Sequence, residues 1–544
     1  MLRLDTAGRS HGSAIVGILT GMPAGVTVDE DEIRKALAMR RAWYGRGERQ
    51  GFEQDEFRII GGVQNGLTTG APVAIQVENV DSRDQINALT VPVPGHGDIG
   101  SAVRLNSPDF SPARERTSAR ETVVRVAIGV IIKAFLMDLS VSLTAHSVQV
   151  GSIVDTGPYP CSVPAIIQMR HKGLGMLRYE NQAVKEVDQA IRQGLSVGGR
   201  IRLIVNGLAP GIGGYETYQE RLDARLAGSL MAIPAIKAVE IGRADQMTGL
   251  WDPGLYGSVL PGAITSGLSG GIEAGMSTGG PIEVFLTIKP VSGVRHRIES
   301  QDLVSSQRTE TPYIRSDTTA IGPALQVVEA QAALEIANAL LKTVGSGPMG
   351  RIRESFQSYS ASAKGILGCP GPIVVCGMPA SGKTAVGTVL AKRLGRDFRD
   401  TDQAIEQVQG MSVADIIRKQ GLAAFRKQEN DVVMESLQGD SRVIALGGGA
   451  LNNEVINAIH RNDGILCFLD TDIDVLVERI VQAQQRPLFD GLDRAGVLQK
   501  CRDIWDKRKS LYQQADIVVP GLPLDMVVEE VFVRIGAWRN YRAA

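Results

Sequence analysis

The chain has 544 residues, of which 58 are Lys or Arg and 59 are Asp or Glu, so its formal net charge is −1. This balance lacks the basic field that binding to a nucleic-acid backbone requires, and an apolar fraction of 43% excludes a disordered chain. No apolar run reaches the ~18 residues of a membrane span, and the five cysteines form no CxxC pair. We therefore expect a cytoplasmic protein with small-molecule partners, and neither nucleic acid nor a membrane among them.

The first 343 residues combine strand-like and helical patterns. Apolar runs predict strands at 201–205 and 281–288, and longer periodic stretches predict helices at 118–139 and 322–342. Glycine is in excess, with 62 residues in the whole chain, or about 11% against a usual ~7%. This region is therefore predicted to be a mixed α/β domain whose backbone closely approaches a ligand at several loops.

Two histidines of this region lie between glycines, His11 in Gly8-Arg-Ser-His-Gly12 and His96 in Pro94-Gly-His-Gly-Asp98. Such a histidine can reach a ligand without neighbouring side chains in the way, although each one alone is more often a loop residue without a catalytic purpose. A set of arginines follows: Arg40, Arg41, Arg46, Arg49, Arg114, Arg116, Arg120 and Arg125. They are explained either by surface salt bridges or by an anionic ligand at the turn 116–118, which leads into a helix N-terminus.

The segment 344–371 is rich in small and polar residues and shows little periodicity, so it is predicted to be a linker between domains 1–343 and 372–544. After it, short apolar strands at 373–376, 443–446 and 465–469 alternate with helical segments. This alternation predicts a parallel sheet with helices on both faces.

The strand at 373–376 is followed by Gly377-Met-Pro-Ala-Ser-Gly-Lys-Thr384, which matches the phosphate-binding P-loop pattern and opens a helix. In such a loop the backbone wraps a nucleotide phosphate, Lys383 reaches the β/γ oxygens, and the Thr384 hydroxyl binds Mg²⁺. Asp400 follows the next strand and is the second candidate Mg²⁺ ligand. The predicted nucleotide-binding residues are Gly377, Ala380, Ser381, Gly382, Lys383 and Thr384.

Further polar clusters accompany the P-loop. Asp402 is placed to accept a substrate hydroxyl, and Arg426 lies three residues before Glu429 on one predicted helix face. Taken alone, that pair is more often a solvated salt bridge than a substrate site. The loop Gly447-Gly-Gly449, the basic lid Arg486-Pro-Leu-Phe-Asp490 and the run Arg508-Lys-Ser-Leu-Tyr512 complete the set.

In this order, the motifs of residues 372 to about 534 closely resemble those of shikimate kinase. The resemblance implies an ATP- and Mg²⁺-dependent phosphorylation of shikimate, with Asp402, Lys383 and Arg486 in catalysis. It assigns shikimate binding to Asp402, Arg426, Gly448 and Arg508, and closure over the phosphates to Arg486.

The first domain resembles chorismate synthase over about residues 1 to 343. The motifs that carry this resemblance are Thr6-Ala-Gly-Arg-Ser-His-Gly12, Tyr44-Gly-Arg-Gly47, Pro94-Gly-His96, Arg116-Thr-Ser-Ala-Arg-Glu-Thr122, Ile233-Pro-Ala-Ile-Lys237, Gly270-Gly-Ile-Glu-Ala-Gly-Met-Ser277, Lys289-Pro290 and Arg315-Ser-Asp317. The resemblance implies a β-α-β sandwich with helices between antiparallel sheets, a homotetramer, and the conversion of 5-enolpyruvylshikimate 3-phosphate to chorismate with reduced FMN.

The same resemblance implies roles for single residues. His11 donates a proton to the departing phosphate, His96 protonates or stabilises the reduced flavin, and Asp317 assists proton removal at the flavin N5 edge. Arg41 and Arg46 match positions for NADPH or substrate anions, which leaves open whether NADPH or an external reductase reduces the flavin. The positions implied for FMN are Arg116, Thr117, Ser118, Pro234, Ala235, Ala274, Lys289, Pro290, Val291, Ser292, Gly293 and Arg315.

The chain departs from the family pattern at Arg9, Val93, Ala274 and Thr319, where the family usually has Glu, Arg, Gly and Cys. These departures leave a second hypothesis open, namely an active shikimate kinase fused to a non-catalytic or divergent flavin-binding or oligomerisation module. The presence of both histidines favours the bifunctional enzyme.

Overall fold

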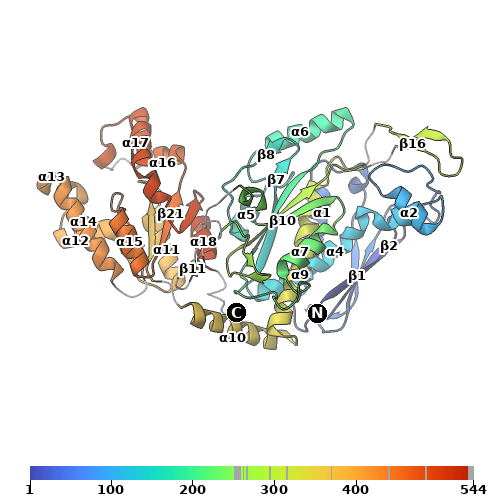
Figure 1. The fold of residues 1–544 in the computed structure, drawn as a ribbon, viewed down its shortest axis with the longest axis horizontal. Helices are drawn as coiled ribbons and strands as arrows, with labels where there is room; N and C mark the ends of the chain where they lie inside the picture. The colour runs from blue at the N-terminus through green and yellow to red at the C-terminus, as the bar shows by residue number, and fades with distance from the viewer. Residues whose placement is uncertain are drawn as a thin grey trace.

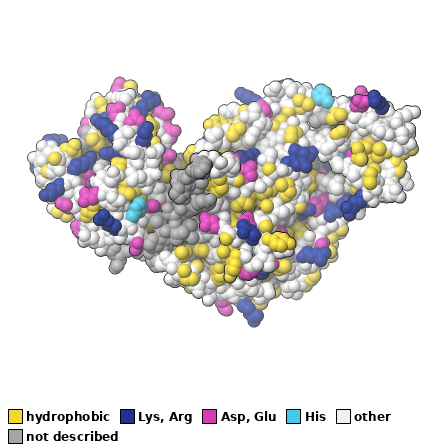
Figure 2. All heavy atoms as spheres, in the orientation of Figure 1, with side chains coloured by type: hydrophobic (Ala, Val, Ile, Leu, Met, Phe, Trp, Pro, Cys, Tyr) yellow, Lys and Arg dark blue, Asp and Glu magenta, His cyan; other side chains and the backbone are white. Residues whose placement is uncertain are grey.

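The computed structural model describes residues 1–249, 259–260, 263–264, 267–292, 296–313, 316–368, 371–438, 442–483 and 487–536. Figure 1 shows the N-terminal part of the chain, in blue to yellow, beside the C-terminal part in orange to red. Every helix among these residues is too short or too polar to cross a membrane. On the face shown in Figure 2, basic and acidic side chains are interspersed.

The N-terminal part is built on two large antiparallel sheets. The first has the strand order β1-β2-β6-β3, and the second has the order β10-β15-β9-β7-β8. Their strands are β1 (Arg3–Gly8), β2 (Ala14–Thr20), β3 (Phe57–Gly61), β6 (Val73–Glu78), β7 (Ser142–Val150), β8 (Ile153–Val154), β9 (Gly199–Asn206), β10 (Ile236–Ile241) and β15 (Ile282–Ile288). The strands predicted at 201–205 and 281–288 are therefore present as β9 and β15.

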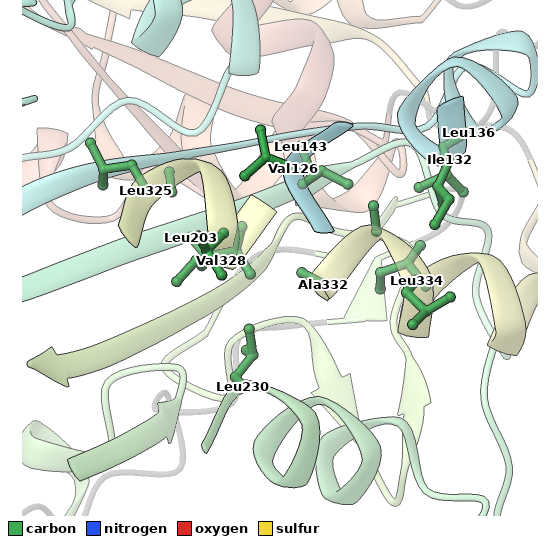
Figure 3. Close-up of a cluster of buried hydrophobic side chains, with 14 of the residues drawn as sticks. Val126, Ile132, Leu136, Leu143, Leu203, Leu230, Leu325, Val328, Ala332 and Leu334 are labelled. Atoms are coloured by element: carbon green, nitrogen blue, oxygen red, sulfur yellow. The ribbon is translucent and has the colours of Figure 1, made fainter. Parts of the chain in front are cut away.

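Two long helices fill the space between these sheets. Helix α4 (Thr122–Asp138) packs on β2 and β6, helix α9 (Ile321–Val344) packs on β7 and β9, and the two helices pack on each other. Both are apolar on nearly every face, as expected for helices covered on all sides. Figure 3 shows this core, in which Val126, Leu203 and Val328 are labelled among others. The arrangement confirms the predicted β-α-β sandwich.

Shorter helices pack against α4 and α9, as α1 (Glu30–Ala42) and α7 (Leu222–Met231) do, or lie in the connections between strands. The others are η1 (Glu48–Gly51), α2 (Asp98–Leu105), α3 (Ser111–Thr117), η2 (Ala119–Glu121), α5 (Val163–Met169), α6 (Glu180–Gln193) and α8 (Ala244–Met247). The helix predicted over 118–139 thus begins only at Thr122, because Ser118 instead caps the short η2 through a hydrogen bond to Arg120 N.

The segment predicted to be an irregular linker contains helix α10 (Met349–Leu367). Met349, Ile352 and Phe356 are buried in the N-terminal core, and the Tyr359 hydroxyl donates to Pro210 O at 3.0 Å. The glycines and prolines that indicated a linker stand at the start of this helix and just beyond its end, while its apolar residues have helical spacing. Most of the segment predicted to be a linker is therefore a helix packed on the N-terminal core, and the domain boundaries themselves stay predictions.

The hairpin of β13 (Ile272–Glu273) and β14 (Met276–Ser277) turns at Ala274 and Gly275, which have φ angles of 49° and 85°. Positive φ at both central residues is the geometry of a type I′ turn, where Ala is strained and Gly is not. We expect Ala274→Gly to raise the free energy of unfolding by about 1 kcal/mol. Thermal unfolding checks this, with Ala224→Gly in helix α7 as a control that should change stability in the opposite direction.

The C-terminal part is built around a parallel five-stranded sheet of order β19-β20-β18-β21-β22. Its strands are β18 (Ile373–Gly377), β19 (Phe398–Asp400), β20 (Val443–Ala445), β21 (Ile465–Asp470) and β22 (Ile517–Pro520). One hydrophobic cluster joins this sheet to α11 (Lys383–Leu394) and α18 (Leu524–Arg534), and a second joins it to α14 (Leu422–Leu437), α15 (Asn453–Arg461), α16 (Ile473–Gln482) and α17 (Arg494–Tyr512). The prediction of a parallel sheet with helices on both faces is confirmed. Two smaller helices, α12 (Thr401–Gln409) and α13 (Val413–Gln420), form a separate small cluster with α14.

Candidate active sites

Helix α3 joins three segments of the predicted N-terminal site. Glu115 accepts hydrogen bonds from the His11 backbone N–H at 2.8 Å and from its Nδ1 at 2.7 Å. Arg114 ion-pairs with the buried Asp98, two residues after His96, and Arg116 donates to the Thr6 hydroxyl at 2.8 Å. The two histidine loops, which are 85 positions apart in the sequence, are thus held by one short helix.

The surroundings of His11 include a second carboxylate. Its Nε2 lies 3.7 Å from Asp81 Oδ2, while Glu115, almost fully buried, holds Nδ1. Sequence reasoning missed both Glu115 and Asp81. No local signal marks them, because the contact between His11 and Glu115 joins residues 104 positions apart.

Residues 116 and 117, predicted as part of a turn, are the last two residues of α3, and Ser118, which follows them, lies against the His11 loop. The Ser118 and Ser10 hydroxyls are 3.0 Å apart, and Arg49 donates to the Ser10 hydroxyl and to its carbonyl. Thr117 is exposed, and its hydroxyl bonds to Ala113 O within α3. The predicted phosphate seat at residues 116–118 and the predicted proton donor are therefore neighbours.

A mostly buried network of ion pairs in the same domain contains Arg41, Arg46, Asp55 and Asp317. Arg46 ion-pairs with Asp317, which also accepts a hydrogen bond from Gly47 N at 2.7 Å. Arg41 donates to Glu53 O, and its Nε lies 3.7 Å from Asp55. The Nε atoms of Arg41 and Arg46 are buried and have no hydrogen-bond partner among the described residues. These arginines are not surface salt bridges, and their free donors fit an anionic ligand.

His96 lies in a different environment from His11. Burial, followed by the charge of Arg114, lowers the pKa of His96 to about 4, with a smaller lowering by Lys289 and an opposing effect of Asp98, so the ring is neutral at pH 7. Its Nδ1 is buried without a hydrogen-bond partner in the described part of the chain. A buried polar atom without a partner inside a glycine loop is the expected mark of a ligand position.

The Lys289 segment borders the His96 loop. Lys289 Nζ donates to the Ser292 hydroxyl at 2.6 Å, and a Cβ added at Gly95 would lie 2.5 Å from that hydroxyl. Lys289 N donates to Ala235 O, which connects the turn 234–235 to the same segment, and Val291 O accepts from Ser196. The structure thus brings His96, residues 234–235 and residues 289–292 together.

Three predicted residues of the two sites, Gly293, Arg315 and Arg486, lie outside the described residues. Ala274 is described, but the turn of its hairpin lies against residues 213–214 and 221–222, away from the other predicted flavin positions. Its predicted place beside the flavin stays a prediction.

In the C-terminal part, the P-loop joins β18 to α11 as the motif predicts. The Thr384 hydroxyl donates to Asp400 Oδ2 at 2.6 Å, so the two predicted metal ligands are adjacent. Lys383 Nζ donates to Gly377 O and Met378 O, and Arg479 of α16, which sequence reasoning missed, donates to Ala380 O at 3.2 Å. Hydroxyl and carboxylate oxygens are the donor set that Mg²⁺ prefers, so these residues fit the ion.

Asp402 begins α12 beside the glycine loop. Burial, followed by the charges of Glu429 and Asp400, raises the pKa of Asp402 to about 6. A Cβ at Gly447 would lie 2.2 Å from Asp402 Oδ1, and one at Gly449 would lie 1.9 Å from Arg426 Nη1. The absence of a side chain at these glycines therefore allows the close approach of Asp402 and Arg426 to the loop.

The pair of Arg426 and Glu429 is not a solvated salt bridge. Glu429 is 1% exposed, whereas the side chain of its ion-pair partner Arg426 is 38% exposed. Gly448 faces open space, since an added Cβ would meet no atom within 4 Å. Arg508 is half-buried on α17, four residues before the buried Tyr512. Asp402, Arg426 and the glycine loop are thus assembled, whereas Arg508 is placed on a neighbouring helix.

Residues 2–341 match the family model described as chorismate synthase. The chain belongs to the chorismate synthase family. Residues 379–533 match the family model described as shikimate kinase. The chorismate synthase of Paenarthrobacter aurescens is 37% identical over 394 residues, which cover 68% of this chain and 99% of that protein. The chorismate synthase of Thermobifida fusca is 39% identical and covers 66% of this chain and 98% of its own length.

A solved structure described as a chorismate synthase has a TM-score of 0.55 and 27% sequence identity, and the likeness covers 67% of this chain and 98% of that one. Two family matches in one chain make this member of the chorismate synthase family a bifunctional enzyme of the shikimate pathway. They do not favour the hypothesis of a kinase carried by a non-catalytic module.

Proposed function

We propose that the N-terminal domain expels phosphate from 5-enolpyruvylshikimate 3-phosphate by 1,4-anti elimination to form chorismate, and that the C-terminal domain phosphorylates shikimate at its 3-hydroxyl with ATP. The observation that carries the first part is the contact between His11 and Glu115 beside the turn 116–118. It places an oriented imidazole next to the side chains of Arg116 and Ser118, whose guanidinium and hydroxyl suit a phosphate.

In this proposal His11 is the proton donor to the departing phosphate. Glu115 engages Nδ1 and the backbone N–H of the same residue, so the ring orientation is set and Nε2 is the atom that transfers the proton. Arg49, which holds Ser10, and Arg116 supply positive charge near the leaving group. General acid catalysis of this kind contributes about 10²–10⁴-fold, and preorganised cations add to it.

The residues around His96 fit a bound flavin. Its unpartnered Nδ1, the ammonium of Lys289 and the turn 116–118 offer a polar ring atom, a cation and phosphate-binding groups. Reduced FMN, when bound, supplies the electron density that the elimination needs. FMN would be held by residues 116–118, 234–235 and 289–293 together with Ala274 and Arg315. Asp317, held by Arg46 and Gly47, would be the group that accepts a proton beside it. Arg41 and Arg46 are also the candidate contacts for NADPH.

In the C-terminal domain the P-loop binds the ATP phosphates, and Thr384 and Asp400 would hold Mg²⁺. Asp402 accepts the proton of the attacking shikimate hydroxyl, and Arg426, fixed by the buried Glu429, binds the shikimate carboxylate together with Gly448 and Arg508. Arg486 would close over the phosphates. Catalysis then rests on positioning and on neutralising the charge of an in-line transfer.

The raised pKa of Asp402 predicts the pH dependence of the kinase reaction. As the pH falls through about 6, Asp402 becomes protonated, and the rate should drop tenfold for each further pH unit. Protonation of Asp402 does not destabilise the fold. A carboxyl whose pKa is raised on folding binds its proton more readily in the folded state, so the free energy of unfolding rises as the pH falls from its folded pKa to its unfolded pKa. A pH–rate profile tests this, and Glu429→Gln, which removes a neighbouring negative charge, should move the midpoint to lower pH.

The proposed synthase activity is tested directly under anaerobic conditions. The full chain is mixed with chemically reduced FMN and 5-enolpyruvylshikimate 3-phosphate, and the absorbance of chorismate is followed, with omission of the flavin as the control. Chorismate formation supports the proposal. Intact phosphorylation of shikimate without chorismate contradicts it, and repeating the assay with oxidised FMN and NADPH determines whether flavin reduction is intrinsic.

We also propose that the protein is a homotetramer assembled through its N-terminal domain, and that it works in the cytoplasm. Four of its cysteines, Cys161, Cys376, Cys467 and Cys501, are free thiols, which supports a reducing compartment. Native mass spectrometry of the full chain tests the oligomeric state, and a monomer at micromolar concentration would contradict it.

A further inference from the structure

The two halves of the chain meet at a buried carboxylate that neither active site uses. Glu530 of α18, in the kinase half, is 0% exposed. Its carboxylate accepts hydrogen bonds from the backbone N–H of Cys161 at 2.7 and 2.8 Å and from that of Ser162 at 2.7 Å, both at the start of α5 in the N-terminal half. Figure 1 shows α18 beside α5, and the two helices contact each other.

Charges of both halves surround Glu530. Arg534, one turn further on α18, donates to it at 2.7 Å. On the N-terminal side, the fully buried Arg202 of β9 ion-pairs with Glu283 and donates to Pro160 O at 2.8 Å, which shapes the turn that presents the two N–H groups. A buried carboxylate is tolerated only when it is paired and hydrogen-bonded, and here two of its three partner residues belong to the other domain.

Apolar packing continues the contact. Ala165 and Met169 of α5 belong to the hydrophobic cluster of the kinase half, where they pack with residues of α18 such as Met526 and Val527. The opposite side of α5 is turned to its own domain, since Val163 and Ile166 cluster with Ile204 of β9. Helix α5 therefore has one face in each domain.

We infer that Glu530 fastens the kinase domain onto the N-terminal domain through the start of α5, so that the two domains remain associated when the connection between them is cut. This inference does not depend on the reactions proposed above. It differs from a tethered arrangement, in which only the covalent connection after α10 keeps the domains in one particle.

The test is a cut in the full-length protein. A recognition sequence for a site-specific protease is inserted directly after Gly368, which is exposed and has open space around its Cα. After cleavage of the folded protein, size-exclusion chromatography on dilution measures the association of the two fragments. We expect co-elution for the parent sequence and, for Glu530→Gln, an association weaker by at least about thirtyfold.

The matched control is Glu529→Gln, since Glu529 ion-pairs with Arg393 inside the kinase domain and should leave the association unchanged. Separation of the parent fragments, or equal association of the Glu530→Gln and Glu529→Gln fragments, would overturn the inference. Shikimate phosphorylation by the uncut Glu530→Gln protein verifies that its kinase domain is folded.

If the kinase domain of the Glu530→Gln protein is not folded, a second pair of variants tests the inference at Ser162, on the N-terminal side of the contact. Ser162→Pro removes one N–H donor at a residue whose φ of −73° suits proline, whereas Ser162→Ala removes only the hydroxyl. Fragments that separate for Ser162→Pro and stay together for Ser162→Ala support the inference. Association of the Ser162→Pro fragments as tight as in the parent overturns it.

Discussion

Asp402→Asn should abolish phosphorylation of shikimate while ATP binding persists. The amide has nearly the shape of the carboxylate but cannot accept a proton, and it stands where burial and the charge of Glu429 have raised the pKa of Asp402 to about 6. We expect the kinase kcat to fall at least 10²–10⁴-fold, the usual contribution of a general base. A coupled assay for ADP release measures the rate, and calorimetry measures ATP binding.

The bifunctional chain offers an internal control for this variant. Chorismate formation by the same protein should be unchanged, because no contact recorded for Asp402 reaches the N-terminal domain in the described residues. Asp415→Asn makes the same chemical change on helix α13, where Asp415 bonds Ser412 and Arg418 near the surface, and should leave both rates unchanged. A kinase rate within twofold of the parent in Asp402→Asn would refute the assigned role.

His11→Asn should remove chorismate formation while the kinase reaction continues. The variant loses the Nε2 proton that the departing phosphate needs, so we expect kcat to fall by about 10²–10⁴-fold. The anaerobic assay with reduced FMN measures it. His171→Asn, at an exposed histidine of the same domain, is the matched control and should retain the parent rate. Equal rates for the two variants would exclude His11 as the proton donor.

Glu115→Gln tests whether Glu115 orients His11 for catalysis. Glutamine has one carbonyl oxygen, so it can accept from only one of the two donors of His11 that Glu115 now engages. Loss of alignment by about 1 Å reduces a reaction by about 10²-fold, so we expect a lower kcat with KM unchanged. An unchanged kcat would show that Glu115 is only structural.

The sequence predicted local features well where the chemistry needs a continuous motif. The P-loop, the strand before it and the helix after it lie where the pattern places them, because the phosphate-binding groups come from consecutive residues. Residues 426 and 429 share one face of α14 as their spacing requires. Their burial was not predictable, since spacing alone does not distinguish a solvated pair from one covered by a neighbouring loop.

Helix α10, in contrast, was not predicted from the sequence. Glycine, serine and proline dominate the region around it, and composition therefore indicated a linker, yet Met349, Ile352 and Phe356 have the spacing of a buried helix face. The β-α-β sandwich also depended on resemblance. Periodicity predicts single strands and helices, but pairing of β2 to β6 across more than fifty intervening residues is decided by long-range burial.

By itself the sequence determined which groups are available for chemistry: two glycine-flanked histidines, an arginine set, a P-loop and the motif order of two enzyme families. Only the tertiary structure decided which of these groups meet. Helix α3 brings Glu115 to His11 and Arg114 to the His96 loop, and Glu530 joins the two domains through residues more than 360 positions away. The reason is physical, because these contacts arise from packing and from the need to pair buried charges, and neither leaves a periodic trace along the chain.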